Sequence, residues 1–449
     1  MSAVADRRLH PSALAIRFIK KIPEFAVGLP ALIGFTSDVG ALYILPMIVA
    51  GASLAFGAAL LGWLRFRYGV GDRDIVIESG IFQRQRRIIP FDRVQDIDIE
   101  QGLLARMFGT VTVRIETGGS GKDEGKLDAV DAAEAKWLRD VIRSRGSASS
   151  AEVALPADEP VLFTMALPRL LLAGVFNFSL LYLAVLGGVF QYVEPFLGWD
   201  KIDPREFVGP AGAAAGDLSA FRIAAIALVL LLLGSITGIV HTVVKNYGFR
   251  LSRSGAGLRR VRGLFTRTEI VIPIRRIQVA VLSSGIVAGF LGWRTLDYQT
   301  LSADAAQSGG QTAVPFGRFE EILPVLAETG HSNIPPDDAF VRVSRRSVAR
   351  RSASVLLPFL VATLALSFAW KGWLLLLPLF PLLIGAAILQ WKRHRYALTD
   401  EALFVARGLL ARRLWILPFE RAHSFTISRG PLQRRLGLAT LSVDTAGAS

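Results

Sequence analysis

The densest group of side chains that could bind a ligand is a series of arginines between residues 250 and 276. It comprises Arg250, Arg253, Arg259, Arg260, Arg262, Arg267, Arg275 and Arg276, with Glu269 as the only acid. Guanidinium groups bind phosphate oxygens through paired, charge-assisted hydrogen bonds. The series therefore predicts contact with anionic lipid headgroups or another anionic ligand. A basic face that is merely solvated fits the same residues equally well.

Patterns typical of an enzyme are missing from the chain. The histidines at 10, 241, 331, 394 and 423 are scattered, no HExxH motif or P-loop lysine is present, and there is no cysteine. We therefore predict no catalytic residue, no metal site and no cofactor. Nucleic acid is a poor candidate ligand, because no aromatic stacking platform accompanies the basic charge.

The arginine series lies in one of three divergent copies of the same segment. With Gly80, Gly263 and Gly408 as position zero, the copies share further residues without a gap. These are Pro90, Pro273 and Pro418 at plus 10, Arg93, Arg276 and Arg421 at plus 13, Gly102, Gly285 and Gly430 at plus 22, and Gly109, Gly292 and Gly437 at plus 29. Such a register predicts a triplicated domain.

The shared positions are interpreted first as structural. Glycines serve turns and close packing, and prolines end strands. For the arginine at plus 13 we favour an internal salt bridge with an acid such as Asp92 or Glu420, and binding of a headgroup is the alternative.

Each copy is preceded by apolar runs long enough to cross a membrane. The composition is 52% hydrophobic, and mean hydropathy is +0.43. We predict six spans in three hairpins, at about 23–37, 41–64, 168–193, 219–244, 353–370 and 373–391. The loop between the third and fourth spans is acidic, whereas arginines flank the other span ends, and the net charge is +14. This asymmetry places all three copies on the cytoplasmic side.

The predicted organisation repeats one unit, a span hairpin followed by a β-rich module. The ranges are 1–66 for the cytoplasmic start and first hairpin, 67–145 for module 1, 146–160 for a linker, 161–245 for the second hairpin with its acidic outer loop, 246–330 for module 2, 331–352 for a basic linker, 353–391 for the third hairpin and 392–449 for an incomplete module 3. Alternating residues predict strands, and helical spacing predicts closing helices at 131–143 and 317–328. In module 3 that helix is absent or cut off.

The module resembles a known domain. Ile89-Pro90, Arg93-Val94-Gln95 and Gln101-Gly102-Leu103-Leu104-Ala105-Arg106 in the first copy are similar to the bacterial pleckstrin-homology-like domain. The alternation of span hairpins with such modules resembles the YdbT-like membrane proteins over essentially the whole chain. The resemblance implies an α+β membrane protein whose modules are antiparallel two-sheet β domains with a C-terminal helix. It implies no catalytic activity.

These observations predict a non-enzymatic scaffold of the bacterial inner membrane, with a role in envelope maintenance. Its cytoplasmic modules would bind protein partners, including a related membrane protein, or anionic headgroups. The alternative is a transport or lipid-handling protein that acts through its six spans.

Overall fold

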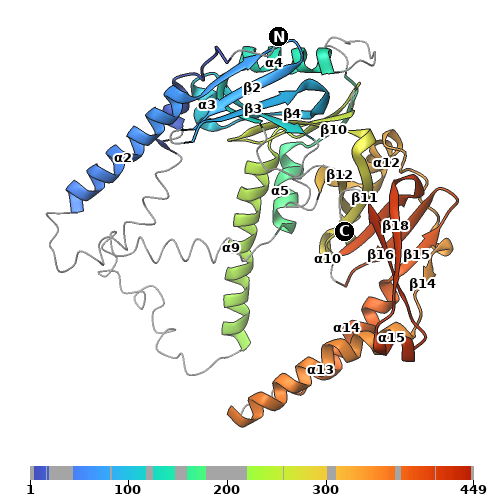
Figure 1. Cartoon of the computed structure of the whole chain (residues 1–449). Helices are drawn as coiled ribbons and strands as arrows, with labels where there is room; N and C mark the ends of the chain where they lie inside the picture. Colours follow the sequence, from blue (N-terminus) through green and yellow to red (C-terminus); the bar gives the residue numbers. More distant parts are fainter. Residues whose placement is uncertain are drawn as a thin grey trace. The chain divides into compact units, whose positions relative to one another are not determined.

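A computed structural model describes residues 5–16, 18–19, 44–80, 83–117, 125–146, 159–177, 220–255, 257–300, 310–369, 376–409 and 411–445 (Figure 1). The chain divides into two compact units, and each is described by itself. The first consists of Met1–Ala157, Met165–Arg250 and Arg260–Val271, and the second of Asp158–Thr164, Leu251–Arg259 and Ile272–Ser449.

The first copy shows the full set of elements of one module. They are β1 (Arg67–Val70), β2 (Asp74–Ser79), β3 (Gln85–Pro90), the 3-10 turn η2 (Phe91–Arg93), β4 (Val94–Gln101), α3 (Leu103–Met107), β5 (Thr110–Thr117), β6 (Gly125–Asp131) and α4 (Ala132–Gly146). Strands β1 to β3 form one antiparallel sheet, and β4 to β6 belong to a second. The two-sheet module with a closing helix, implied by the family resemblance, is therefore present here.

The second and third copies repeat this order. The second contains β8 (Arg250–Ser254), β9 (Gly257–Arg262), β10 (Arg267–Pro273), η4 (Ile274–Arg276), β11 (Ile277–Ser284), α10 (Ile286–Phe290), β12 (Trp293–Thr300), β13 (Gln311–Arg318) and α12 (Phe319–Glu328). The third contains β15 (Arg395–Leu398), β16 (Ala402–Arg407), β17 (Arg412–Pro418), η7 (Phe419–Arg421), β18 (Ala422–Ser428), α15 (Pro431–Arg435) and β19 (Thr440–Thr445). Short strands β7 (Val161–Thr164) and β14 (Val341–Arg342) precede these two copies, and β14 lies in the range predicted as a basic linker.

The glycines at position zero are required by the backbone. Gly80, Gly263 and Gly408 have φ of 113°, 112° and 139°, in the region that favours glycine. A Cβ atom at these positions would lie 1.8–1.9 Å from the carbonyl oxygen three residues later. The structural role predicted for these glycines thus has a direct cause at the turn.

The core of the first module lies between its strands and the closing helix α4. Ile75, Val113, Leu127 and Leu138 are completely buried there. Helix α4 contacts β4, β5 and β6, so its apolar stripe covers the second sheet. Burial of one such side chain contributes about 1.5–3 kcal/mol, which explains why the spacing of apolar residues predicted this helix.

Apolar helices precede the modules. They are α2 (Ile44–Arg65), α5 (Leu167–Phe176), α9 (Ala220–Asn246), α13 (Arg346–Ala369) and α14 (Leu379–Arg393). Among the described residues, one stretch, Arg346–Ser367, is long and apolar enough to cross a membrane. Shorter apolar helical stretches lie at Val49–Arg65, Leu167–Phe176 and Leu231–Asn246. The predicted span at 23–37, most of that at 168–193 and the acidic outer loop lie outside the described residues.

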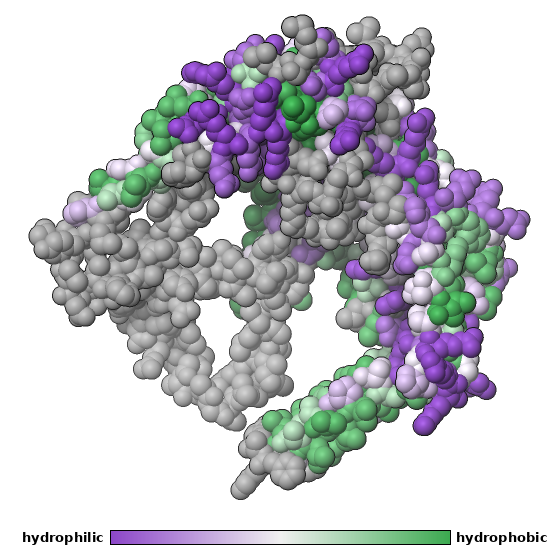
Figure 2. Space-filling model, viewed as in Figure 1, coloured by the Kyte–Doolittle hydropathy of each residue, from purple (hydrophilic) through white to green (hydrophobic). Residues whose placement is uncertain are grey.

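The helices expose hydrophobic side chains. Figure 2 shows green, hydrophobic residues along α2 and α13, purple, hydrophilic ones over the strands of the first copy, and a mixture of both over the third copy. In the first unit, α9 and α5 pack closely because Gly238 lies against Gly174, where a Cβ on Gly238 would be 2.5 Å from the Gly174 carbonyl oxygen. Small residues at such a crossing are typical of helices that pair in membranes.

Neighbouring copies share sheets. In the first unit the strand order is β6-β5-β4-β10, so a strand of the second copy extends the sheet of the first. In the second unit the order is β13-β12-β11-β17-β16-β15-β14, so the third copy extends the sheet of the second. The strand edge of each copy thereby gains main-chain hydrogen bonds from the next copy.

Candidate functional site at the hairpin tips

Each copy carries an arginine at plus 4, immediately before or at the start of its third strand. The three side chains, Arg84, Arg267 and Arg412, are exposed. We call residues 80–84, 263–267 and 408–412 the hairpin tips. All three follow one pattern, a glycine, two apolar residues, any residue and an arginine. Sequence reasoning placed Arg267 in the basic series but missed that an arginine recurs at plus 4 in all three copies, although the same register contains it.

The tip of the second copy lies against the end of helix α9. The amide of Gly263 donates a hydrogen bond to the carbonyl of Tyr247 (2.9 Å), and the amide of Leu264 donates to the carbonyl of Val244 (3.0 Å). The last carbonyls of a helix have no partner within the helix. The hairpin tip therefore caps α9 and is fixed at the helix end.

Basic and amphipathic side chains surround this helix end. Arg262 donates to the Oδ1 atom of Asn246 (3.4 Å), and Lys245 lies in the last turn. Cations at a helix C-terminus are stabilised by the helix dipole. The side chains of Phe265 and Tyr247 are 49% and 46% exposed. Aromatic and basic residues at the end of an apolar helix are typical of the boundary between membrane and water.

The tip of the third copy also contacts an apolar helix, but through a side chain of the helix rather than through amides of the tip. Arg393, in the last turn of α14, donates a hydrogen bond to the carbonyl of Leu409 in the tip. Lys392 is exposed beside it. In the first copy the two apolar tip residues, 81 and 82, lie outside the described residues, and Arg84 is exposed.

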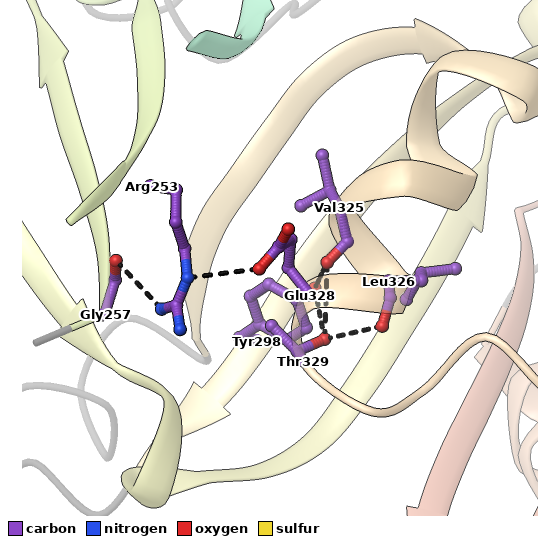
Figure 3. Close-up of polar contacts among 7 residues, drawn as sticks. All are labelled: Arg253, Gly257, Tyr298, Val325, Leu326, Glu328 and Thr329. Atoms are coloured by element: carbon purple, nitrogen blue, oxygen red, sulfur yellow. Dashed lines mark hydrogen bonds and ion pairs between the residues drawn. The ribbon is translucent and has the colours of Figure 1, made fainter. Parts of the chain in front are cut away.

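The eight arginines of the predicted series have different surroundings. Arg250, Arg267 and Arg275 are exposed, Arg253, Arg259, Arg262 and Arg276 are half-buried, and Arg260 is buried. Arg253 forms an ion pair with Glu328 (3.1 Å) and donates to the carbonyl of Gly257, as Figure 3 shows. Arg259 pairs with Glu159 (3.3 Å). Contact of this series with headgroups stays a prediction, and the exposed members are the ones open to such contact.

The arginines at plus 13 are also dissimilar. Arg421 donates to the backbone carbonyl of Arg275 (3.0 Å), which belongs to the preceding copy. Arg93 is exposed, and no ion pair joins it to Asp92 within the described residues. Arg276 is half-buried. At Arg421 this position thus connects one copy to another rather than to a carboxylate of its own turn.

A buried polar network holds the closing helix of the second copy. The hydroxyl of Tyr298 lies 2.9 Å from the Thr329 hydroxyl and donates to the carbonyl of Val325 (3.2 Å), as Figure 3 shows in part. The Nδ1 atom of His331 lies 2.7 Å from the Thr329 carbonyl oxygen. Burial raises the pKa of Tyr298 and lowers the pKa of His331. Both side chains are therefore neutral near pH 7, and they fasten α12 to β12.

Metal-ligating side chains do not gather into groups of three within the described part of the chain. The prediction that the protein holds no metal stays a prediction.

Comparison with known proteins agrees with the repeated fold. The bacterial PH domain family matches this chain over residues 24–146, 179–328 and 352–449. The transmembrane protein YdbT of Bacillus subtilis (strain 168) is 23% identical over 410 residues, covering 87% of this chain and 82% of YdbT. The transmembrane protein YdbS of the same organism is 39% identical over 77 residues, covering 17% of this chain and 46% of YdbS. No solved structure matches the chain significantly.

Proposed function

This chain belongs to the bacterial PH domain family, as a membrane protein with three repeats of the domain, and from that premise we propose that it is a non-enzymatic scaffold of the bacterial inner membrane. Its six spans hold the three modules at the cytoplasmic face. There the modules bind anionic lipid headgroups and protein partners, and the protein contributes to maintenance of the cell envelope. The related transmembrane proteins support the membrane location alone.

The observation that carries the proposal is the capping of helix α9 by the hairpin tip. It fixes Arg267 and Phe265 beside the end of an apolar helix. An aromatic ring there enters the boundary layer, and the guanidinium reaches phosphate oxygens at the same depth. The third tip contacts α14 through a hydrogen bond from the Arg393 side chain to the Leu409 carbonyl. A triplicated tip gives three headgroup contacts on one chain.

The expected strength of these contacts is modest. One arginine close to an anionic surface contributes about 1 kcal/mol, which corresponds to about a fivefold preference for anionic over neutral lipid. Three tips acting together would make that preference substantial, whereas a single tip would be weak. This is consistent with a scaffold that is held by spans and oriented by its modules.

The test compares two variants of the full chain with equal charge. In one, Arg84, Arg267 and Arg412 are replaced by Gln; in the control, three exposed arginines outside the predicted series, Arg106, Arg429 and Arg435, are replaced by Gln. Each protein is reconstituted in equal amounts of phosphatidylglycerol and phosphatidylcholine, extracted, and its retained lipids are measured by mass spectrometry.

We expect the unchanged chain and the control to retain phosphatidylglycerol preferentially over phosphatidylcholine. The preference of the tip variant should be at least about fivefold lower than that of the unchanged chain. An equal loss of the lipid preference in the two variants would mean that overall charge, and not the hairpin tips, causes the preference. Absence of any preference in the unchanged chain would refute headgroup binding.

A further inference from the structure

The two junctions between neighbouring copies have the same strand register. At the first junction, Arg267 pairs with Gln101, Thr268 with Glu100 and Glu269 with Ile99. Counted from the glycine of each copy, plus 4 pairs with plus 21, plus 5 with plus 20 and plus 6 with plus 19. At the second junction, Arg412 pairs with Ser284, Arg413 with Ser283 and Leu414 with Leu282, which are the same positions. The register is therefore a property of the domain and not of one pair of strands.

Side chains strengthen both junctions. In the first, Arg139 of helix α4 forms an ion pair with Glu269 of β10 at 2.7 Å. In the second, the pairing continues to Ala280 opposite Ile416, both of which are almost completely buried. The contact of Arg421 with the Arg275 carbonyl lies at the same junction.

The terminal copies each leave one equivalent edge open. Strand β3 of the first copy pairs with β2, and β18 of the third pairs with β19, and neither has a second neighbour among the described strands. Their counterparts β10, β17, β4 and β11 all do. An open edge of this kind is a template for another strand.

Side chains along the open edges are exposed where their counterparts are buried. Ile88, at plus 8 in β3, is 51% exposed, whereas Val271 and Ile416 at the same position are 3% and 1% exposed. Phe425, at plus 17 in β18, is 54% exposed, whereas Ala280 at the same position is 0% exposed. The second-junction register would place Ile88 opposite Phe425.

We propose that β3 of one chain pairs antiparallel with β18 of a second copy of this chain, in the register of the internal junctions. Gln85 then lies opposite Ser428, Arg86 opposite Ile427 and Ile88 opposite Phe425. The exposed Arg93 of the first chain donates to the backbone carbonyl of Glu420 in the other, as Arg421 does to Arg275.

A second copy is the occupant because one chain presents both complementary edges, one at each end of its series of copies. The interface is head-to-tail, because it joins different surfaces of the two chains. Further chains can therefore be added in the same way. Main-chain hydrogen bonds provide affinity, and the Ile88–Phe425 pair provides register. This assembly does not depend on headgroup binding.

Cysteine cross-linking tests the register directly, because the natural chain has no cysteine. Arg86→Cys and Ile427→Cys are made in separate, differently tagged full-length chains, which are co-expressed and oxidised in native membranes. We expect a disulfide-linked species at twice the mass of the 48.7 kDa chain, containing both tags. The matched control replaces Ile427→Cys by Leu441→Cys, which is similarly exposed but lies opposite Ile427 on β19, one strand further from the proposed partner β3.

The proposed register requires at least about tenfold more cross-link for the 86–427 pair than for the 86–441 pair, and none for either variant alone. Cross-linking of Arg86→Cys to a different protein, or equal yields with the control, would overturn it. A chain carrying both cysteines that cross-links only within itself would overturn it as well.

A second measurement tests the same interface without disulfide formation. Ile88→Asp and Phe425→Asp are exposed substitutions that should leave each chain folded. In detergent, light scattering should show an oligomer for the unchanged chain and a monomer for either variant. Circular dichroism should be the same for all three proteins. An unchanged oligomer, or a monomeric unchanged chain, would contradict the proposal.

Discussion

At the scale of the residue, His331 is a buried base held neutral by its surroundings. Burial lowers its pKa, while the nearby Thr329 carbonyl opposes that shift and Arg421 adds to it. An unfolded chain has histidine with a pKa of about 6.5. The unfolded state therefore binds a proton before the folded state does, so stability is full above about pH 6.5 and declines as the pH falls toward the folded pKa.

We predict that helix α12 becomes less protected between about pH 7.5 and about pH 5.5, and that His331→Asn removes most of this dependence. Amide hydrogen exchange of residues 319–329, corrected for its intrinsic pH dependence, measures it in the full chain. Helix α4 is the internal control, because His331 does not belong to its module. An equal response of α12 with and without His331 would contradict the assignment.

Individual residues also show what the sequence could and could not predict. The turn glycines were predicted to be structural because a repeated glycine has few physical causes, and their positive φ angles are consistent with that interpretation. The partner of Arg421 was not, because a backbone carbonyl from another copy leaves no trace in the sequence of the turn. The recurrence of the tip arginine could have been found, since an arginine follows the aligned glycine by four residues in every copy.

At the scale of the element, an ion pair between α4 and β10 adds to the strand pairing at the first junction. Arg139 is nearly buried, and Glu269 is the carboxylate that neutralises it at 2.7 Å. Removal of one partner from a buried pair leaves the other charge without compensation. We expect Glu269→Gln to weaken the junction by about 2 to 3 kcal/mol, because the pair is only partly shielded from water.

The matched control is Glu78→Gln, which removes an exposed ion pair with Arg86 at 3.5 Å. It should cost about 0.5 kcal/mol or less. Hydrogen exchange of the peptides that contain β4 and β10 provides the measurement. A smaller effect of Glu269→Gln than of the control would show that strand pairing alone holds the junction.

The elements themselves followed from local pattern. Alternating residues predicted β4 and β5, and helical spacing predicted the closing helix at 131–143, which extends over Ala132–Gly146. The pairing of β4 with β10 could not be predicted, because pairing of distant strands depends on edges that meet only in the folded chain. The shared sheets therefore emerged only from the structure.

At the scale of the whole molecule, the proposed function depends on repetition of the domain more than on any single site. On the proposed function, a single tip would bind headgroups weakly, whereas three tips on one chain would add their contacts. The apolar runs made a membrane protein predictable from the sequence, and the related transmembrane proteins agree. The six predicted spans were not all confirmed, since one helical stretch among the described residues is long and apolar enough to cross a membrane.

The central claim is that the hairpin tips lie in the headgroup layer. Within the first unit, α9 leads away from the strands on the side opposite α4 (Figure 1), so a probe on α4 should be remote from the lipid. The direct measurement uses full-length chains with Phe265→Cys or the exposed Asp140→Cys of α4, each carrying an environment-sensitive fluorophore, in bilayers whose headgroups carry a quencher. We predict strong quenching at position 265 and little at position 140. Equal quenching at the two positions, or none at position 265, would contradict the account.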